Sequence, residues 1–120
     1  MAMSMVKIEE FLRRLRNDPA SITFSDSMEV ITSHYEYNAT EFYNGDQHNA
    51  AGTNEGSCKI LAFGQLQDLT VEETLQCFGD YYRLDVLQHP DADDHQNIRQ
   101  FIKHGWQGVR FPDNALTEKQ

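Results

Sequence analysis

A long polar stretch from Asn44 to Lys59 constrains this chain more than any other feature. Its sequence is NGDQHNAAGTNEGSCK, rich in glycine and carboxamides, and it leads directly into the apolar run ILAFGQL. Connections longer than about a dozen residues are uncommon in compact domains, and those that occur are usually disordered or functional. Because the far end leads into an apolar segment, we expect this coil to be held in place and to form a recognition surface.

The apolar run predicts a buried central helix from Ser57 to Gln67. The hydroxyl of Ser57 would cap its first turn. Apolar side chains would cover the helix on several sides, namely Ile60, Leu61, Phe63 and Leu66. The coil and the start of this helix would form a small site for a ligand or a simple anion. Its candidate binding residues are Asn44, Asn54, Ser57 and Lys59.

Helical periodicity and capping patterns predict four more helices. The first spans Val6 to Arg16. The second opens with the box Asp26-x-x-Glu29 and closes at His34, and the fourth opens with the box Thr70-x-x-Glu73. The N-cap candidates of the fifth helix are Asp91, Asp93 and Asp94. Gly105 would end this helix. A short helical turn is expected between Tyr81 and Pro90.

Alternating aromatic and polar residues from Tyr35 to Tyr43 predict one or two short strands, followed by a turn at Asn44-Gly45. A strand from Val109 to Phe111 would pair with them. The predicted fold is therefore a mainly helical α+β single domain over residues 1–120, with about five helices around the central helix and a small antiparallel sheet. Residues 1–5 and 113–120 are expected to be loose ends.

The charge of the chain bears on its partners. With 120 residues and a formal net charge of −9, the molecule repels phosphate backbones and anionic lipids, so we expect neither nucleic acid nor a membrane as partner.

The sequence has no apolar run near 18 residues and no signal peptide. Two cysteines without repeated spacing argue against a disulfide scaffold. We expect a soluble, cytoplasmic domain without a cofactor.

Cys58 is the sharpest candidate for chemistry. In the first turn of the central helix, the helix dipole and Lys59 would lower the pKa of its thiol. With His48 or His95 as base, the protein would be a small cysteine hydrolase. The alternative is that Cys58 is a small buried apolar residue.

The segment HPDADDH from His89 to His95 offers a second possibility. Two imidazoles and three carboxylates lie close together in the sequence, and both groups ligate metals. No standard ligand spacing is matched, however, and acidic residues at a helix start stabilise the helix without any ion. We therefore predict no metal site. If a metal did bind here, His89 and His95 would be its ligands.

The aromatics Tyr81, Tyr82 and Trp106 beside Arg83 are either interaction residues or partly buried core.

Four strings in the chain resemble the HopJ type III effector family. They are AGTNEGSCKILAF, LQCFGDYYRLDVLQHP, DHQNIRQFIKHGW and the pair Asn44-Gly45, and the resemblance extends from about Phe11 to Leu116. The resemblance implies delivery through a type III secretion system and supplies no catalytic residues. The leading functional hypothesis is a non-enzymatic domain that binds a protein or a small molecule, and the sequence leaves the partner and the oligomeric state open. The alternative is the cysteine-dependent or metal-assisted hydrolase.

Overall fold

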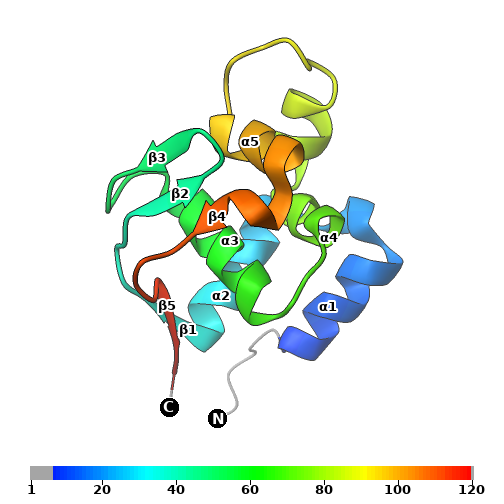
Figure 1. The fold of residues 1–120 in the computed structure, drawn as a ribbon. Coiled ribbons are helices and arrows are strands. Elements are labelled where there is room, and N and C mark those ends of the chain that lie inside the picture. Colours follow the sequence, from blue (N-terminus) through cyan, green and yellow to red (C-terminus); the bar gives the residue numbers. More distant parts are fainter. Residues whose placement is uncertain (1–6, 120) are drawn as a thin grey trace.

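The computed structural model describes residues 7–119. Figure 1 shows helices packed around α3, with β2 and β3 on one side of it and α1 and α4 on the other. The elements follow the chain in this order: α1 (Ile8–Asn17), the 3-10 turn η1 (Pro19–Ser21), α2 (Phe24–His34), β1 (Tyr35–Tyr37), β2 (Phe42–Asn44), β3 (Gln47–Asn49), α3 (Glu55–Leu66), α4 (Val71–Gln76), the π-helix η2 (Tyr81–Val86), α5 (Gln96–His104), the 3-10 turn η3 (Gly105–Gly108), β4 (Val109–Arg110) and β5 (Leu116–Glu118).

The helix α3 is the centre of the core, as predicted. Its middle section is buried almost completely, and the ring of Phe63 makes edge contacts with Phe11 at 5.9 Å and with Tyr35 at 6.0 Å between ring centroids. The prediction for Leu66 was wrong, because its side chain is 55% exposed in the last turn of the helix.

The strands form two small antiparallel sheets, with the order β3-β2-β4 in one and β1-β5 in the other. The strand predicted from Val109 to Phe111 is β4, and its predicted pairing is confirmed, since Tyr43 in β2 lies opposite Arg110. The tail from residue 113 is not loose: Leu116–Glu118 pairs with β1, and the Lys119 N–H donates to the His34 carbonyl at 3.0 Å. Residues 1–5, also predicted to be loose, lie outside the described residues.

The irregular part of the polar stretch from Asn44 to Lys59 is shorter than its sequence predicted. Gly45 has a φ of +60°, which allows a tight turn after β2. The chain then returns as β3, where His48 lies opposite Tyr43. Only the segment 50–54 remains as an irregular connection before α3.

Capping explains where two helices begin. The box at Thr70 and Glu73 is confirmed for α4, with reciprocal side-chain to backbone bonds of 2.9 and 3.1 Å. The box predicted for α2 was placed three residues too late. Thr23 is the N-cap of α2 and forms the box with Asp26, at 3.0 Å in both directions.

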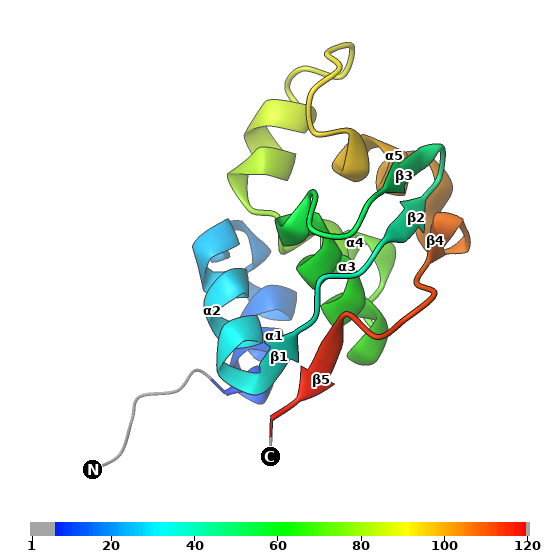
Figure 2. The same cartoon turned by 90° about the vertical axis from the view of Figure 1, so that its left-hand side faces the viewer.

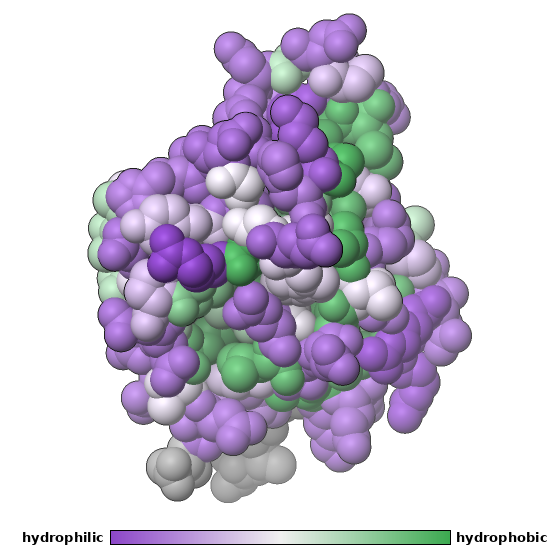
Figure 3. Space-filling model, viewed as in Figure 1, coloured by the Kyte–Doolittle hydropathy of each residue, from purple (hydrophilic) through white to green (hydrophobic). Residues whose placement is uncertain are grey.

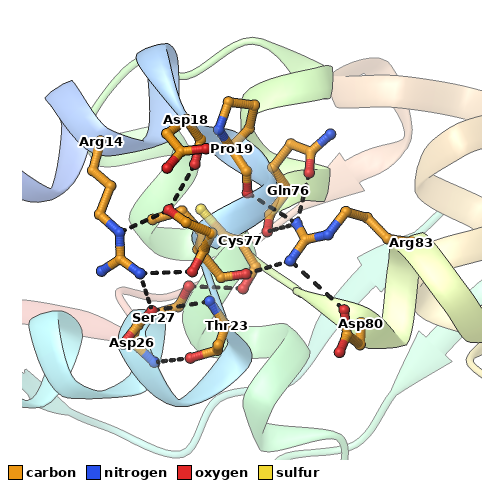
Figure 4. A network of polar contacts seen from close by, with 12 residues as sticks. Arg14, Asp18, Pro19, Thr23, Asp26, Ser27, Gln76, Cys77, Asp80 and Arg83 are labelled. Atoms are coloured by element: carbon orange, nitrogen blue, oxygen red, sulfur yellow. Dashed lines mark hydrogen bonds and ion pairs between the residues drawn. The ribbon is translucent and has the colours of Figure 1, made fainter.

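Arg83 joins η2 to the start of α2 (Figure 4). Its guanidinium donates to the carbonyls of Ile22 and Pro19 and to the side-chain oxygen of Gln76, the last two at 3.1 and 2.7 Å. Asp80 is 3.8 Å away and 75% exposed at its side chain, so the carbonyls are the main partners. Arg83 therefore fixes the position of η2 against the rest of the domain.

Hydrophilic residues cover most of the face shown in Figure 3. Hydrophobic residues gather at the upper right of this view, over the segment that is yellow-green in Figure 1. In this segment Leu84 and Leu87 are 46% and 52% exposed.

Candidate functional site

A pocket of about 450 Å³ lies where the first turns of α3 and α5 meet η2. In Figure 2 the beginnings of these two helices and the yellow-green η2 surround this region. The lining combines aromatic rings, carboxamides and backbone, and consists of Phe24, Gln47, Asn54, Gly56, Ser57, Phe78, Tyr81, His95, Gln96, Asn97 and Ile98. This volume lies in the range of small-molecule sites, and the lining is more polar than in most of them.

The first wall of the pocket is the start of α3. Asn54 is the N-cap residue in a left-handed conformation, with φ 50° and ψ 47°, and its side chain makes no capping bond. The Cys58 N–H donates to the Asn54 carbonyl at 3.0 Å, so the N–H groups of Glu55, Gly56 and Ser57 have no acceptor inside the helix. The prediction that Ser57 caps the helix was wrong, because the helix begins two residues earlier.

The second wall is the start of α5, which has the same construction. His95 is left-handed, with φ 52° and ψ 49°, and makes no capping bond. The prediction that an aspartate caps this helix was wrong, because Asp94 binds Arg99 at 2.6 Å instead. The Ile98 N–H donates to the His95 carbonyl, which leaves Gln96 and Asn97 without intrahelical acceptors. Two helix starts with uncapped donors thus face one pocket.

The third wall is aromatic and comes partly from η2. The ring of Tyr81 makes an edge contact with Phe24 at 5.1 Å and a tilted contact with His95 at 5.2 Å. Asp85, also in η2, lies 3.0 Å from the Nε2 of His95. Single turns of π-helix are rare and often occur at functional sites. Here the π-helix supplies both a ring of the wall and the carboxylate that holds His95.

Buried asparagines form the floor beneath the pocket. Asn44 is fully buried and donates to the main-chain and side-chain oxygens of Asn97 at 2.8 and 3.0 Å. The side-chain oxygen of Asn49 accepts from Asn97 at 2.9 Å and from Asn54 at 2.7 Å. This cluster links β2, β3, the coil before α3 and the start of α5. Within residues 7–119 the Oδ1 of Asn44 is buried without a partner.

The predicted binding residues divide into three groups. Asn54 and Ser57 line the pocket, and Asn44 lies below it. Lys59 is elsewhere, with its Nζ 4.7 Å from the centroid of the Tyr37 ring. The sequence reasoning missed Gln47, Asn49, Gln96 and Asn97. One signal was present, because asparagines recur at every fifth position in Asn44, Asn49 and Asn54.

The expectation of a reactive Cys58 thiolate was wrong. The side chain is 1% exposed, and its thiol donates a weak bond to the Thr40 carbonyl at 3.8 Å. Burial raises the pKa of the Cys58 thiol to about 11, because the loss of hydration outweighs the attraction of Lys59. The structure does not place the candidate bases beside it: His48 lies against Glu41 at 2.9 Å, and His95 lies against Asp85.

A labelling experiment tests whether Cys58 is a buried, unreactive thiol. In the folded protein at pH 7, Cys58 is expected to resist iodoacetamide, and to react as the pH approaches its pKa of about 11 or when denaturant unfolds the chain. Peptide mass spectrometry measures its alkylation separately from that of Cys77. Labelling of Cys58 in the folded protein at neutral pH, as fast as in the unfolded chain, would contradict the assignment.

The residues His89 and His95 are not assembled into a metal site. His89 is exposed, and its carbonyl accepts from Arg99 at 3.0 Å. Over residues 7–119, no group of three or more His, Cys, Asp or Glu side chains is arranged to hold a metal ion.

Comparisons with known proteins identify the family. The family model described as HopJ type III effector protein matches residues 8–116, so the chain belongs to the HopJ type III effector family. It is similar to a solved structure titled as a protein of unknown function, VPA0580, with 46% sequence identity, a TM-score of 0.95 and 97% of each chain covered. No curated protein matches this chain. In the described part of the chain, no helix has the length and apolarity to span a membrane.

Proposed function

We propose that this HopJ family member is a non-enzymatic domain that binds a small molecule in the pocket between α3, α5 and η2. One observation carries the proposal: hydrogen-bonding groups from three segments face the same cavity without being used by the fold. Gln47 and Ser57 line the pocket, and in the described chain their side chains make no hydrogen bond. The uncapped N–H groups of the two helix starts add further donors.

Most polar groups of the lining are suited to binding a ligand. It contains no Asp, Glu, Lys, Arg or Cys side chain. His95 and Tyr81 are its titratable groups, and the His95 Nε2 is engaged by Asp85 at 3.0 Å. Carboxamides donate and accept hydrogen bonds but do not transfer protons near neutral pH. Such groups favour recognition of a ligand.

The proposal predicts where ligands bind. In a fragment screen with the full ¹⁵N-labelled chain, chemical-shift changes are expected to cluster on the amides of 54–57 and 95–98. Ser57→Leu would fill the pocket and abolish these changes. The matched control is Gln65→Leu on an exposed position near the other end of α3, which should leave them intact. Shifts confined to another face, or no binding fragment at all, would contradict a small-ligand function.

We also propose that the protein is delivered through a type III secretion system. The support is the family description, which names type III effectors. Cys58 and Cys77 are both free and buried, which suits synthesis in a reducing cytoplasm before delivery.

A further inference from the structure

The polar groups in the pocket are of a kind that limits the ligand. Four of the lining residues carry carboxamides, namely Gln47, Asn54, Gln96 and Asn97, and Ser57 adds a hydroxyl. Each of these groups can both donate and accept a hydrogen bond. Asn54, Gln96 and Asn97 use part of this capacity within the fold, whereas Gln47 and Ser57 keep all of it. A ligand hydroxyl has the same double capacity, so a ligand with several hydroxyl groups can pair with Gln47, Ser57 and the remaining capacity of the other amides.

The charge around the pocket disfavours a strongly anionic ligand. Each helix start contributes about half a positive charge. Two carboxylates oppose it: Glu55 in the first turn of α3 and Asp85 at 3.0 Å from the His95 ring. A third, Asp94, lies 3.8 Å from that ring but is paired with Arg99. Phosphate sites in proteins are typically completed by Arg or Lys, and the lining contains neither. The net charge of −9 acts in the same direction.

The aromatic wall supplies the apolar part of recognition. Tyr81 is 44% exposed, so its ring remains available to a ligand at the mouth of the pocket. The face of an aromatic ring is negative and attracts weakly positive C–H groups. A sugar ring presents such C–H groups on its faces and hydroxyls around its edge, which matches an aromatic wall next to a carboxamide wall.

From these observations we infer that the pocket binds a neutral carbohydrate, in the size range of a mono- or disaccharide. The inference rests on the small-ligand function proposed above and specifies its ligand class. Tyr81 would pack against the sugar ring, while Gln47, Ser57 and Gln96 would bind its hydroxyls. The asparagine cluster would hold the start of α5 in position beneath the sugar.

The test is an NMR titration of the full chain with named probes. The neutral probes are glucose, N-acetylglucosamine, cellobiose and diacetylchitobiose, and the anionic probes are glucuronic acid and glucose 6-phosphate. At least one neutral sugar is expected to shift the amides of 54–57 and 95–98 with a Kd on the order of 1 mM. The anionic probes are expected to bind more weakly than the neutral sugar of the same ring.

Substitutions then identify the ring contact. Tyr81→Ala is expected to weaken binding about fivefold or more, and Tyr81→Phe to preserve it, because the ring face makes the contact. The matched control is Tyr43→Ala. Tyr43 is half-buried on β2, between His48 and Arg110 and outside the pocket lining, so its loss should leave the Kd unchanged.

The outcomes separate the two proposals. If the fragments shift the pocket amides but no neutral sugar does, the carbohydrate class is wrong and the small-ligand function stands. Tighter binding of the anionic probes would overturn the inference of a neutral ligand. If neither fragments nor sugars bind the pocket, both proposals fail. A Tyr43→Ala loss equal to that of Tyr81→Ala would overturn the assignment of Tyr81 as the ring contact.

Discussion

Replacing Gly79 with alanine is expected to lower the free energy of unfolding by about 3 kcal/mol, through left-handed strain and overpacking together. Gly79 has a φ of +64° and is buried. An added Cβ would lie 2.7 Å from the amide nitrogen of Phe24 and 3.1 Å from the carbonyl carbon of Thr23. These are backbone atoms at the start of α2, so relief of the clash requires α2 to shift. Urea denaturation measures the loss.

The control for this substitution is Gly52→Ala. Gly52 also has a positive φ, of +85°, but an added Cβ would meet no atom within 4 Å. Its replacement should therefore cost only the conformational part, about 1 kcal/mol. Equal losses at the two positions would show that the close approach to α2 contributes nothing, and would contradict the packing described at Gly79.

Replacing Arg83 with alanine is expected to cost about 3 kcal/mol, because hydrogen bonds from a charged donor to poorly hydrated carbonyls are among the stronger ones in proteins. The side chain is 17% exposed and holds the carbonyls of Pro19 and Ile22 against η2 (Figure 4). Ile22 is fully buried, so its carbonyl would lose a partner that water replaces poorly. Thermal and urea unfolding measure the change.

Two further variants show what Arg83 contributes. Arg83→Lys keeps the charge but has no planar fork to reach several carbonyls, so it should lose most of the same stability. Arg13→Ala removes an exposed arginine of α1 and should change stability by less than about 0.5 kcal/mol. Full retention of stability in Arg83→Lys would mean that charge, and not the set of hydrogen bonds, is what matters.

Features set by local sequence were predictable in this fold. The apolar run of α3 and the capping box of α4 act within a few residues, and both predictions are confirmed. The strands β3 and β5 were missed for a different reason. Residues 47–49 carry no strand preference and pair because the turn at Gly45 returns the chain. Leu116 pairs with Tyr37, a partner far away in the sequence.

The site was predictable only on its α3 side. Asn54 and Ser57 were found because they belong to one polar stretch, whereas Tyr81 and Gln96 reach the pocket through packing of distant segments. Lys59 was misplaced by helix geometry, since two residues after Ser57 the side chain has rotated by about 200° around the axis. Burial of Cys58, which no local pattern reveals, reversed the expected direction of its pKa shift.

The linked asparagines below the pocket bear on the rate and affinity with which the proposed ligand would bind. Asn97 and Asn49 bond to each other and to Asn44 and Asn54, so the segments that carry them share one hydrogen-bonded framework. Conformational freedom at this floor is given up when the chain folds, before any encounter. Binding of the proposed ligand should then use a preformed site, with little rearrangement of the main chain.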